Sequence, residues 1–240
     1  MPAMKIEDRI IIALDMNSRA RALECVAELM PQASYFKVGS QLFTACGPDL
    51  VREIVALGAR IFLDLKFHDI PQTVANAVLE AARLKVAMLT LHASGGMTML
   101  QAASRSLAEK YSPEERPRLI AVTMLTSIGE ADSREIGFSL PMADQSVRLA
   151  HMAQRAGLDG VVASPLEIVH IREACGKDFL IVTPGIRPAN AVLDDQVRIA
   201  TAEAALQSGA DYLVIGRPIL EAPNPRQALQ ELVASLRTIS

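Results

Sequence analysis

Three charged side chains end an apolar stretch within residues 62–73, Phe-Leu-Asp-Leu-Lys-Phe-His-Asp-Ile-Pro-Gln-Thr. Because side chains alternate between the two faces of a strand, Asp64 and Lys66 point to the same side. Asp69 follows three residues later and precedes Pro71, which suits the first turn of a helix. The spacing predicts a lysine flanked by carboxylates at a strand-to-helix junction, which can tune that lysine for proton transfer. On an exposed strand end, the same pattern would be an ordinary solvated ion cluster.

Length and composition favour one globular domain over the whole chain, 1–240. The chain has 240 residues, close to the roughly 250 residues of a single eightfold β/α barrel. Apolar residues make up 50% and charged residues 21%, so the chain can bury a substantial core. The net charge of −3 gives no electrostatic footprint for nucleic acid or an anionic membrane. An anionic substrate would therefore need a local basic site.

The cysteines and the N-terminal sequence indicate a cytoplasmic protein. Cys25, Cys46 and Cys175 are scattered and lack the close pairing of a zinc or redox motif, which fits a reducing compartment. The apolar run 10–14 is interrupted by Asp15, and it is too short for a secretory signal or a membrane span. We interpret this run as the first strand.

Short apolar runs alternate with helix-like segments along the chain. The predicted strands are 10–14, 35–38, 60–65, 86–91, 119–124, 160–163, 179–182 and 212–215. Segments with helical spacing of apolar residues are 18–30, 49–57, 73–84, 97–110 and 145–155. Strands that alternate with helices predict a parallel sheet.

Two arrangements of such a sheet are compatible with this pattern, and we predict the α/β fold of a single (β/α)8 TIM barrel. A doubly wound dinucleotide fold would carry Gly-x-Gly-x-x-Gly after its first strand, and this chain does not. Distinctive polar residues instead follow nearly every predicted strand, as in barrels. The long connection 125–145 is expected to hold a short extra helix over the site, and 184–196 is expected to be functional.

Polar groups of the side chains and backbone from separate strands should converge on one mouth of this barrel. They are Asp15, Lys37, Asp64, Lys66, His92, Thr126, Ser127, Arg187, Gly216 and Arg217. Each has an ordinary alternative when taken alone. Asp15 could cap a helix, Lys37 could extend to solvent, and His92 could be a hydrogen-bonded structural histidine. The convergence of the set is what favours an active site.

The loops after the seventh and eighth strands resemble a phosphate site. Barrels commonly bind phosphate there. Gly185 and Gly216 allow the backbone to approach an anion closely, and Arg217 supplies a fork of donors. The alternative is that Gly-Arg-Pro at 216–218 only turns the chain into the last helix.

The sequence resembles the orotidine 5′-phosphate decarboxylase family, of the bacterial type, across essentially its whole length. The residues that carry the resemblance are Asp15 and the segments 37–39, 64–71, 92–96, 122–127, 183–187, 195–196 and 211–218. One departure is Thr201-Ala202, where relatives often have Thr-Pro, and this affects only a helix start.

The resemblance implies a role for each candidate residue. Lys66 would be the proton donor in a catalytic array that Lys37, Asp64 and Asp69 complete, with Asp69 supplied by the other subunit of a homodimer. The implied substrate contacts are Asp15 and Lys37 at the ribose, Asp64 near the departing carboxylate, Thr126 and Ser127 at the pyrimidine, Gln196 between base and phosphate, Arg187, Gly216 and Arg217 at the phosphate, and Thr73 across the interface.

The implied reaction converts orotidine 5′-phosphate to UMP and CO₂, the last step of de novo pyrimidine nucleotide synthesis, with no cofactor and no metal. It leaves a carbanion with no adjacent carbonyl, and the chain shows no cofactor motif to accept the charge. A fixed ammonium could stabilise that carbanion and then protonate it. Two alternatives stay open: a metal-dependent sugar-phosphate lyase or aldolase with the same Asp-x-Lys-x-x-Asp pattern, and a non-catalytic barrel that binds a phosphate ligand.

Overall fold

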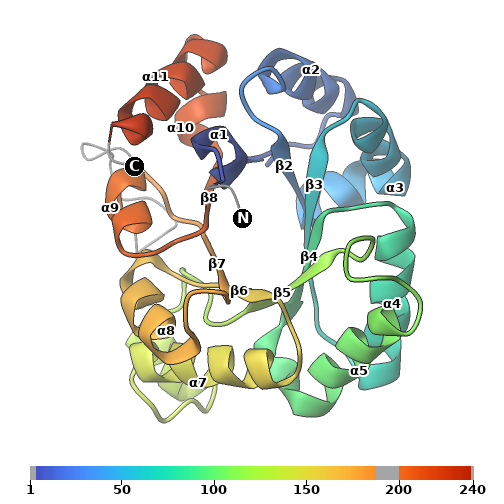
Figure 1. Cartoon of the computed structure of the whole chain (residues 1–240), viewed down its shortest axis with the longest axis vertical. Helices are drawn as coiled ribbons and strands as arrows, with labels where there is room; N and C mark the ends of the chain where they lie inside the picture. Colours follow the sequence, from blue (N-terminus) through green and yellow to red (C-terminus); the bar gives the residue numbers. More distant parts are fainter. Residues whose placement is uncertain (1–3, 188–199, 239–240) are drawn as a thin grey trace.

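The computed structural model describes residues 4–187 and 200–238, and its eight parallel strands close into a barrel in chain order (Figure 1). The strands are β1 Ile10–Ala13, β2 Tyr35–Gly39, β3 Arg60–Phe67, β4 Met88–His92, β5 Arg118–Val122, β6 Gly160–Val162, β7 Leu180–Thr183 and β8 Tyr212–Ile215. The last strand, β8, pairs with β1 and completes the ring. This confirms the predicted (β/α)8 fold.

Helices surround the strands on the outside of the barrel (Figure 1). They are α1 Ile6–Arg9, α2 Arg19–Leu29, α3 Ser40–Ala56, α4 Pro71–Arg83, α5 Gly96–Ala108, α6 Glu130–Glu135, α7 Met142–Arg155, α8 Ile168–Cys175, α9 Ala202–Gln207, α10 Arg217–Leu220 and α11 Pro225–Arg237. Two short 3₁₀ turns, Ala93–Gly95 and Pro165–Glu167, follow β4 and β6. Within the described ranges, every helix is too short or too polar to cross a bilayer.

Strand alternation divides the apolar side chains into two layers. Ile10 and Ile12 of β1 pack in the outer layer against the helices, whereas Ile11 and Ala13 pack inside the barrel. The inner cluster comprises Ile11, Ala13, Tyr35, Phe62, Met88, Ile120, Val182, Tyr212 and Val214. Burying a side chain such as Phe62 stabilises a fold by roughly 1.5–3 kcal/mol. The interior is therefore a packed core below the site.

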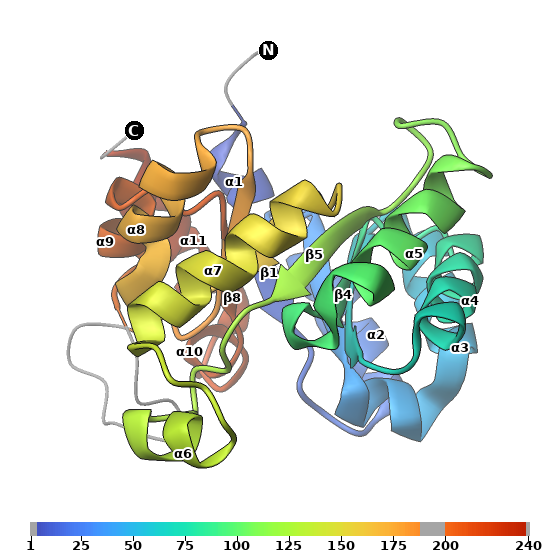
Figure 2. The same ribbon diagram turned by 90° about the horizontal axis from the view of Figure 1, so that it is seen from below.

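The amino-terminal end of the barrel is closed by the first residues of four strands. The rings of Tyr35 and Tyr212 meet edge to face at 5.6 Å, and the Arg60 guanidinium lies 4.3 Å from the Tyr35 ring centre. Arg118 donates a hydrogen bond to the Tyr212 hydroxyl, and burial raises the pKa of Tyr212 to about 12. Figure 2 shows α1 at this end and α6 and α10 at the opposite end. Ligand access is therefore through the carboxyl ends of the strands.

Three local expectations can be compared with the structure. Helix α3 consists of two helical segments that meet at Gly47, where the backbone is not helical (φ 68°), so the predicted helix from residue 49 corresponds to the second segment and the first segment was not predicted. The predicted extra helix in the 125–145 connection is α6, at the same end of the barrel as α10 (Figure 2). The Thr201 side chain caps α9 by accepting from Ala204 N at 3.2 Å, so the departure at 201–202 does lie at a helix start.

Candidate active site

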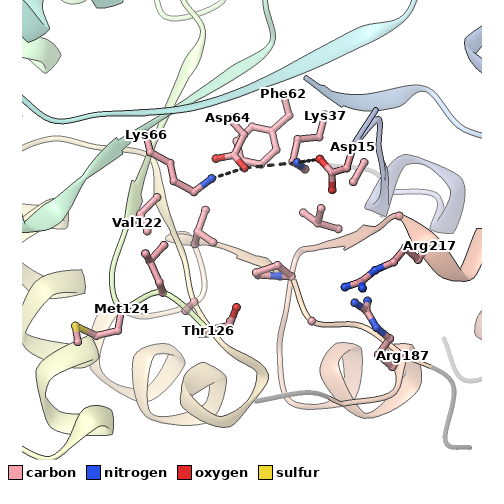
Figure 3. A pocket seen from close by; sticks show the side chains of 18 of the residues that line it. Asp15, Lys37, Phe62, Asp64, Lys66, Val122, Met124, Thr126, Arg187 and Arg217 are labelled. Carbon is pink, nitrogen blue, oxygen red and sulfur yellow. Dashed lines mark hydrogen bonds and ion pairs between the residues drawn. The ribbon is translucent and has the colours of Figure 1, made fainter. Parts of the chain in front are cut away.

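A pocket of about 490 Å³ opens at the carboxyl ends of the strands. Figure 3 shows its polar side chains on two sides, with a row of acidic and basic groups facing a pair of arginines. The pocket is lined by Asp15, Lys37, Asp64, Lys66, Thr126, Gly185, Arg187, Gly216, Arg217 and Glu221, together with apolar side chains that include Phe62, Val122 and Met124. Most of these residues come from separate strand ends, as predicted.

The acidic and basic groups form a continuous row of alternating charge (Figure 3). Asp15 accepts a hydrogen bond from Lys37 Nζ at 2.7 Å, and Lys37 Nζ lies 3.8 Å from Asp64 Oδ2. That same carboxylate oxygen accepts a hydrogen bond from Lys66 Nζ at 2.8 Å. The order is therefore Asp15, Lys37, Asp64, Lys66, and the formal charges of the row sum to zero.

Burial differs along this row in a way that matters for chemistry. The side chains of Lys37 and Asp64 are each 11% exposed, whereas that of Lys66 is 34% exposed. Buried charges are tolerated when each one faces an opposite charge and a hydrogen-bond partner. The Lys66 ammonium is thus more accessible from the pocket than that of Lys37, and its hydrogen bond to Asp64 holds it in place.

The local backbone explains why Lys66 points into the pocket. Phe62 packs inside the barrel, and strand alternation places Asp64 on the same inner face. Lys66 then adopts φ of 53°, which is uncommon for a residue other than glycine. The pairing of β3 with β4 shifts register between Leu63 and Phe67, around this residue. Backbone conformations of this kind cluster at functional sites.

The opposite side of the pocket is basic. Arg187 follows β7 and Arg217 begins α10, and Figure 3 shows their guanidinium groups close together. Gly185 has φ of 79°, a conformation that glycine adopts without strain. A Cβ at Gly216 would lie 3.3 Å from Ala13 Cβ, so the backbone passes closely beside β1. Two guanidinium forks at one edge of a pocket suit an oxyanion such as phosphate.

Other predicted site residues lie elsewhere. In the part of the chain that the structure describes, Asp69, Thr73 and Ser127 are exposed and are not among the residues that line the pocket. Asp69 Oδ1 accepts a hydrogen bond from Ile70 N at 2.6 Å. Gln196 lies outside the described residues. The pocket of one chain therefore holds Asp64, Lys66 and Lys37 of the proposed array without Asp69.

His92 lies beside the array, outside the pocket lining. Its ring centre is 5.4 Å from that of His68, and the two rings are tilted by 32°. Burial lowers the pKa of His92, and the neighbouring His68 and Lys66 lower it further. A neutral imidazole is therefore favoured at this position.

The sequence interpretation missed several residues at the site. Thr90 of β4 is fully buried and donates a hydrogen bond to Asp64 Oδ1 at 3.0 Å. Phe62 and Met124 add apolar walls, and Glu221 adds a carboxylate near α10. Strand alternation could have placed Phe62, two residues before Asp64, on the inner face. Among the described residues, no group of three or more His, Cys, Asp or Glu side chains could hold a metal ion.

Comparison with known proteins agrees with this geometry. Residues 8–232 match the model of the orotidine 5′-phosphate decarboxylase / HUMPS family. The chain is 54% identical to orotidine 5′-phosphate decarboxylase of Geotalea daltonii, with 95% of each chain covered. It is 51% identical to the Geobacter sulfurreducens protein of that name, with 94% of this chain and 95% of the relative covered. A crystal structure of the Lactobacillus acidophilus decarboxylase superposes with a TM-score of 0.84 at 38% identity, covering 95% of this chain and 99% of that one.

Proposed function

This chain belongs to the orotidine 5′-phosphate decarboxylase / HUMPS family, and on that premise we propose that it converts orotidine 5′-phosphate to UMP and CO₂. This is the last step of de novo pyrimidine nucleotide synthesis. The observation that carries the proposal is the row Asp15, Lys37, Asp64, Lys66, which faces two arginines across one pocket. We assign the function to one catalytic domain, residues 1–240.

The reaction breaks the bond between C6 of the pyrimidine and its carboxylate. The electron pair of that bond stays on C6 as CO₂ leaves, and a proton from the Lys66 ammonium then forms the C6–H bond of UMP. The ammonium, held by Asp64 at 2.8 Å, stabilises the developing charge before it gives up its proton. We propose that this electrostatic stabilisation replaces a cofactor or metal.

Binding is divided between the two sides of the pocket. Asp15 and Lys37 hold the ribose hydroxyls, because their carboxylate and ammonium can accept from and donate to a diol. Arg187, Arg217 and the backbone at Gly216 hold the phosphate. Thr126 and Ser127 bind the pyrimidine, and Gln196 joins base and phosphate. Of this last group, Thr126 lines the pocket.

We further propose a homodimer in which Asp69 and Thr73 of one subunit complete the partner's site. Both residues are exposed and lie outside their own pocket. The adjacent Ile70 is 67% exposed, the largest exposed fraction among the large apolar side chains in the described ranges, and it would be covered in such an interface. In this arrangement the partner's Asp69 extends the charged row past Lys66.

We place the enzyme in the cytoplasm.

An absorbance assay tests the proposed function. Purified protein is mixed with orotidine 5′-phosphate, with and without a metal chelator. We expect loss of the substrate absorbance and formation of UMP at the same rate in both samples. Activity that the chelator removes would favour a metal-dependent enzyme. Binding of UMP without any turnover would identify a phosphate-ligand-binding barrel, and either result would reject the proposal.

A further inference from the structure

We propose that Thr90 is a positioning residue for this reaction. Its side chain contacts Asp64 and the Lys66 backbone at the place where β3 and β4 lose their regular pairing. Thr90 is fully buried and is not among the residues that line the pocket, so it acts through its neighbours. This inference rests on the proposed decarboxylation and adds a residue that lies behind the charged row.

The irregular pairing creates a need for such a residue. Leu63 pairs with Leu89 and Phe67 pairs with Leu91, so three residues of β3 stand opposite the single residue Thr90. An irregularity of this kind bends a strand and removes some of its ladder hydrogen bonds. Lys66 lies in this segment with φ of 53°. Its backbone N–H consequently requires a partner other than the regular ladder.

The Thr90 hydroxyl satisfies two groups at once. Lys66 N donates to Thr90 Oγ1 at 2.8 Å, and Thr90 Oγ1 donates to Asp64 Oδ1 at 3.0 Å. A hydroxyl has one hydrogen to give, so acceptance from the Lys66 amide leaves that hydrogen for the carboxylate. The other carboxylate oxygen, Asp64 Oδ2, binds Lys66 Nζ. Thr90 thus closes a ring that fixes both the rotation of the carboxylate and the backbone that carries the ammonium.

Loss of this hydroxyl should affect turnover more than binding. It would leave the Lys66 amide and Asp64 Oδ1 without a hydrogen-bond partner at a fully buried position, and the strand segment would relax to find others. A displacement of reacting groups by about 1 Å can cost on the order of 100-fold in rate. Arg187 and Arg217 lie across the pocket and would keep their positions (Figure 3).

The test compares Thr90→Val with Thr90→Ser. Valine matches the shape of threonine without the hydroxyl, whereas serine keeps the hydroxyl. We expect Thr90→Val to lower kcat for orotidine 5′-phosphate by about 10- to 100-fold, with the Kd for UMP changed by less than about 3-fold because the phosphate contacts persist. Thr90→Ser should have a kcat close to that of the wild type.

Ser34→Ala is the matched control. The Ser34 hydroxyl accepts from Arg60 Nη2 and donates to Asp8 Oδ1, each at 2.6 Å, beside the first residue of β3 at the amino-terminal end of the barrel. This substitution should lower thermal stability while the kcat per folded molecule stays near the wild-type value. Should Thr90→Val fold poorly, Thr90→Ala removes the same hydroxyl with less bulk, and the same loss of kcat is expected.

The possible results separate the two proposals. Three results would each overturn the positioning role alone, provided that the wild-type protein decarboxylates orotidine 5′-phosphate. They are an unchanged kcat in Thr90→Val, an equal loss of kcat in Ser34→Ala, and a Thr90→Ser variant as slow as Thr90→Val. Wild-type protein that does not decarboxylate orotidine 5′-phosphate would overturn the proposed function, and the role of Thr90 would fall with it.

Discussion

Lys66 Nζ lies 2.8 Å from Asp64 Oδ2, so the proposed proton donor is paired with a carboxylate that is almost entirely buried. The same oxygen lies 3.8 Å from Lys37 Nζ, which gives the carboxylate a second cationic neighbour. A single buried carboxylate between two ammonium groups keeps both of them in place. The position of Lys66 in the pocket therefore depends on Asp64 as much as on its own backbone.

Arg217→Ala should weaken kcat/KM for orotidine 5′-phosphate by on the order of 100-fold, because charge-assisted hydrogen bonds to phosphate are among the stronger polar contacts. Binding energy from the phosphate also helps to organise the reacting centre. Free phosphite should therefore accelerate wild-type turnover of the substrate that lacks its phosphate, and Arg217→Ala should lose this acceleration. Steady-state kinetics measure both effects.

Arg105→Ala is the control for the loss of an arginine, since Arg105 is exposed on α5. Its kinetics should match those of the wild type. An Arg217→Ala variant with wild-type kcat/KM on orotidine 5′-phosphate would exclude Arg217 from the phosphate site.

Asp69→Asn and Lys66→Ala homodimers should each be nearly inactive, yet a mixture of the two should recover activity. In a heterodimer, one site receives both lesions and the other receives none, if Asp69 serves the partner's pocket. Random exchange makes half of the dimers mixed, with one intact site in each, so about a quarter of the wild-type activity is expected. The two proteins must be unfolded and refolded together to guarantee exchange. A purified heterodimer without activity would place Asp69 in its own chain's site.

His92 should make folding stability depend on pH. Burial, His68 and Lys66 lower its pKa in the folded protein below the ordinary value of 6.5, while the nearby Asp64 opposes this shift. As the pH falls, His92 therefore binds a proton in the unfolded chain at a higher pH than in the folded protein. Its contribution to folding stability is fully present above pH 6.5 and is lost as the pH falls toward the pKa of the folded state. Urea unfolding at pH 8 and pH 5.5 should show a smaller pH effect in His92→Gln than in the wild type. An identical pH effect in both proteins would contradict this assignment.

The fold could be predicted because its signals are local. Strand β8 spans Tyr212–Ile215, the same four residues that the apolar run indicated. Asp64 and Lys66 do meet on one side, as the sequence predicted, although the backbone irregularity at Lys66 interrupts the regular strand alternation on which that prediction rested. Gly47 and Pro48 are typical of a helix break, and the backbone at Gly47 is indeed not helical, so the sequence located the second segment of α3 but not the first.

The parts of the site that escaped prediction depend on contacts between strands. The role of Thr90 follows from a register shift between β3 and β4, and pairing register is set by tertiary packing that one strand's sequence does not reveal. Asp69 and Thr73 were assigned to a second subunit by resemblance, and their exposure in a single chain leaves that assignment as a prediction.

The central claim is that Lys66 supplies charge stabilisation and the proton, and the most direct test is the kcat of Lys66→Ala together with its affinity for UMP. We predict a fall in kcat of about 1,000-fold or more, because both general acid catalysis and electrostatic stabilisation are lost. UMP should still bind, since the ribose and phosphate contacts lie elsewhere in the pocket. Lys110→Ala, at an exposed lysine, should behave like the wild type. A Lys66→Ala enzyme that keeps most of its kcat would contradict the account.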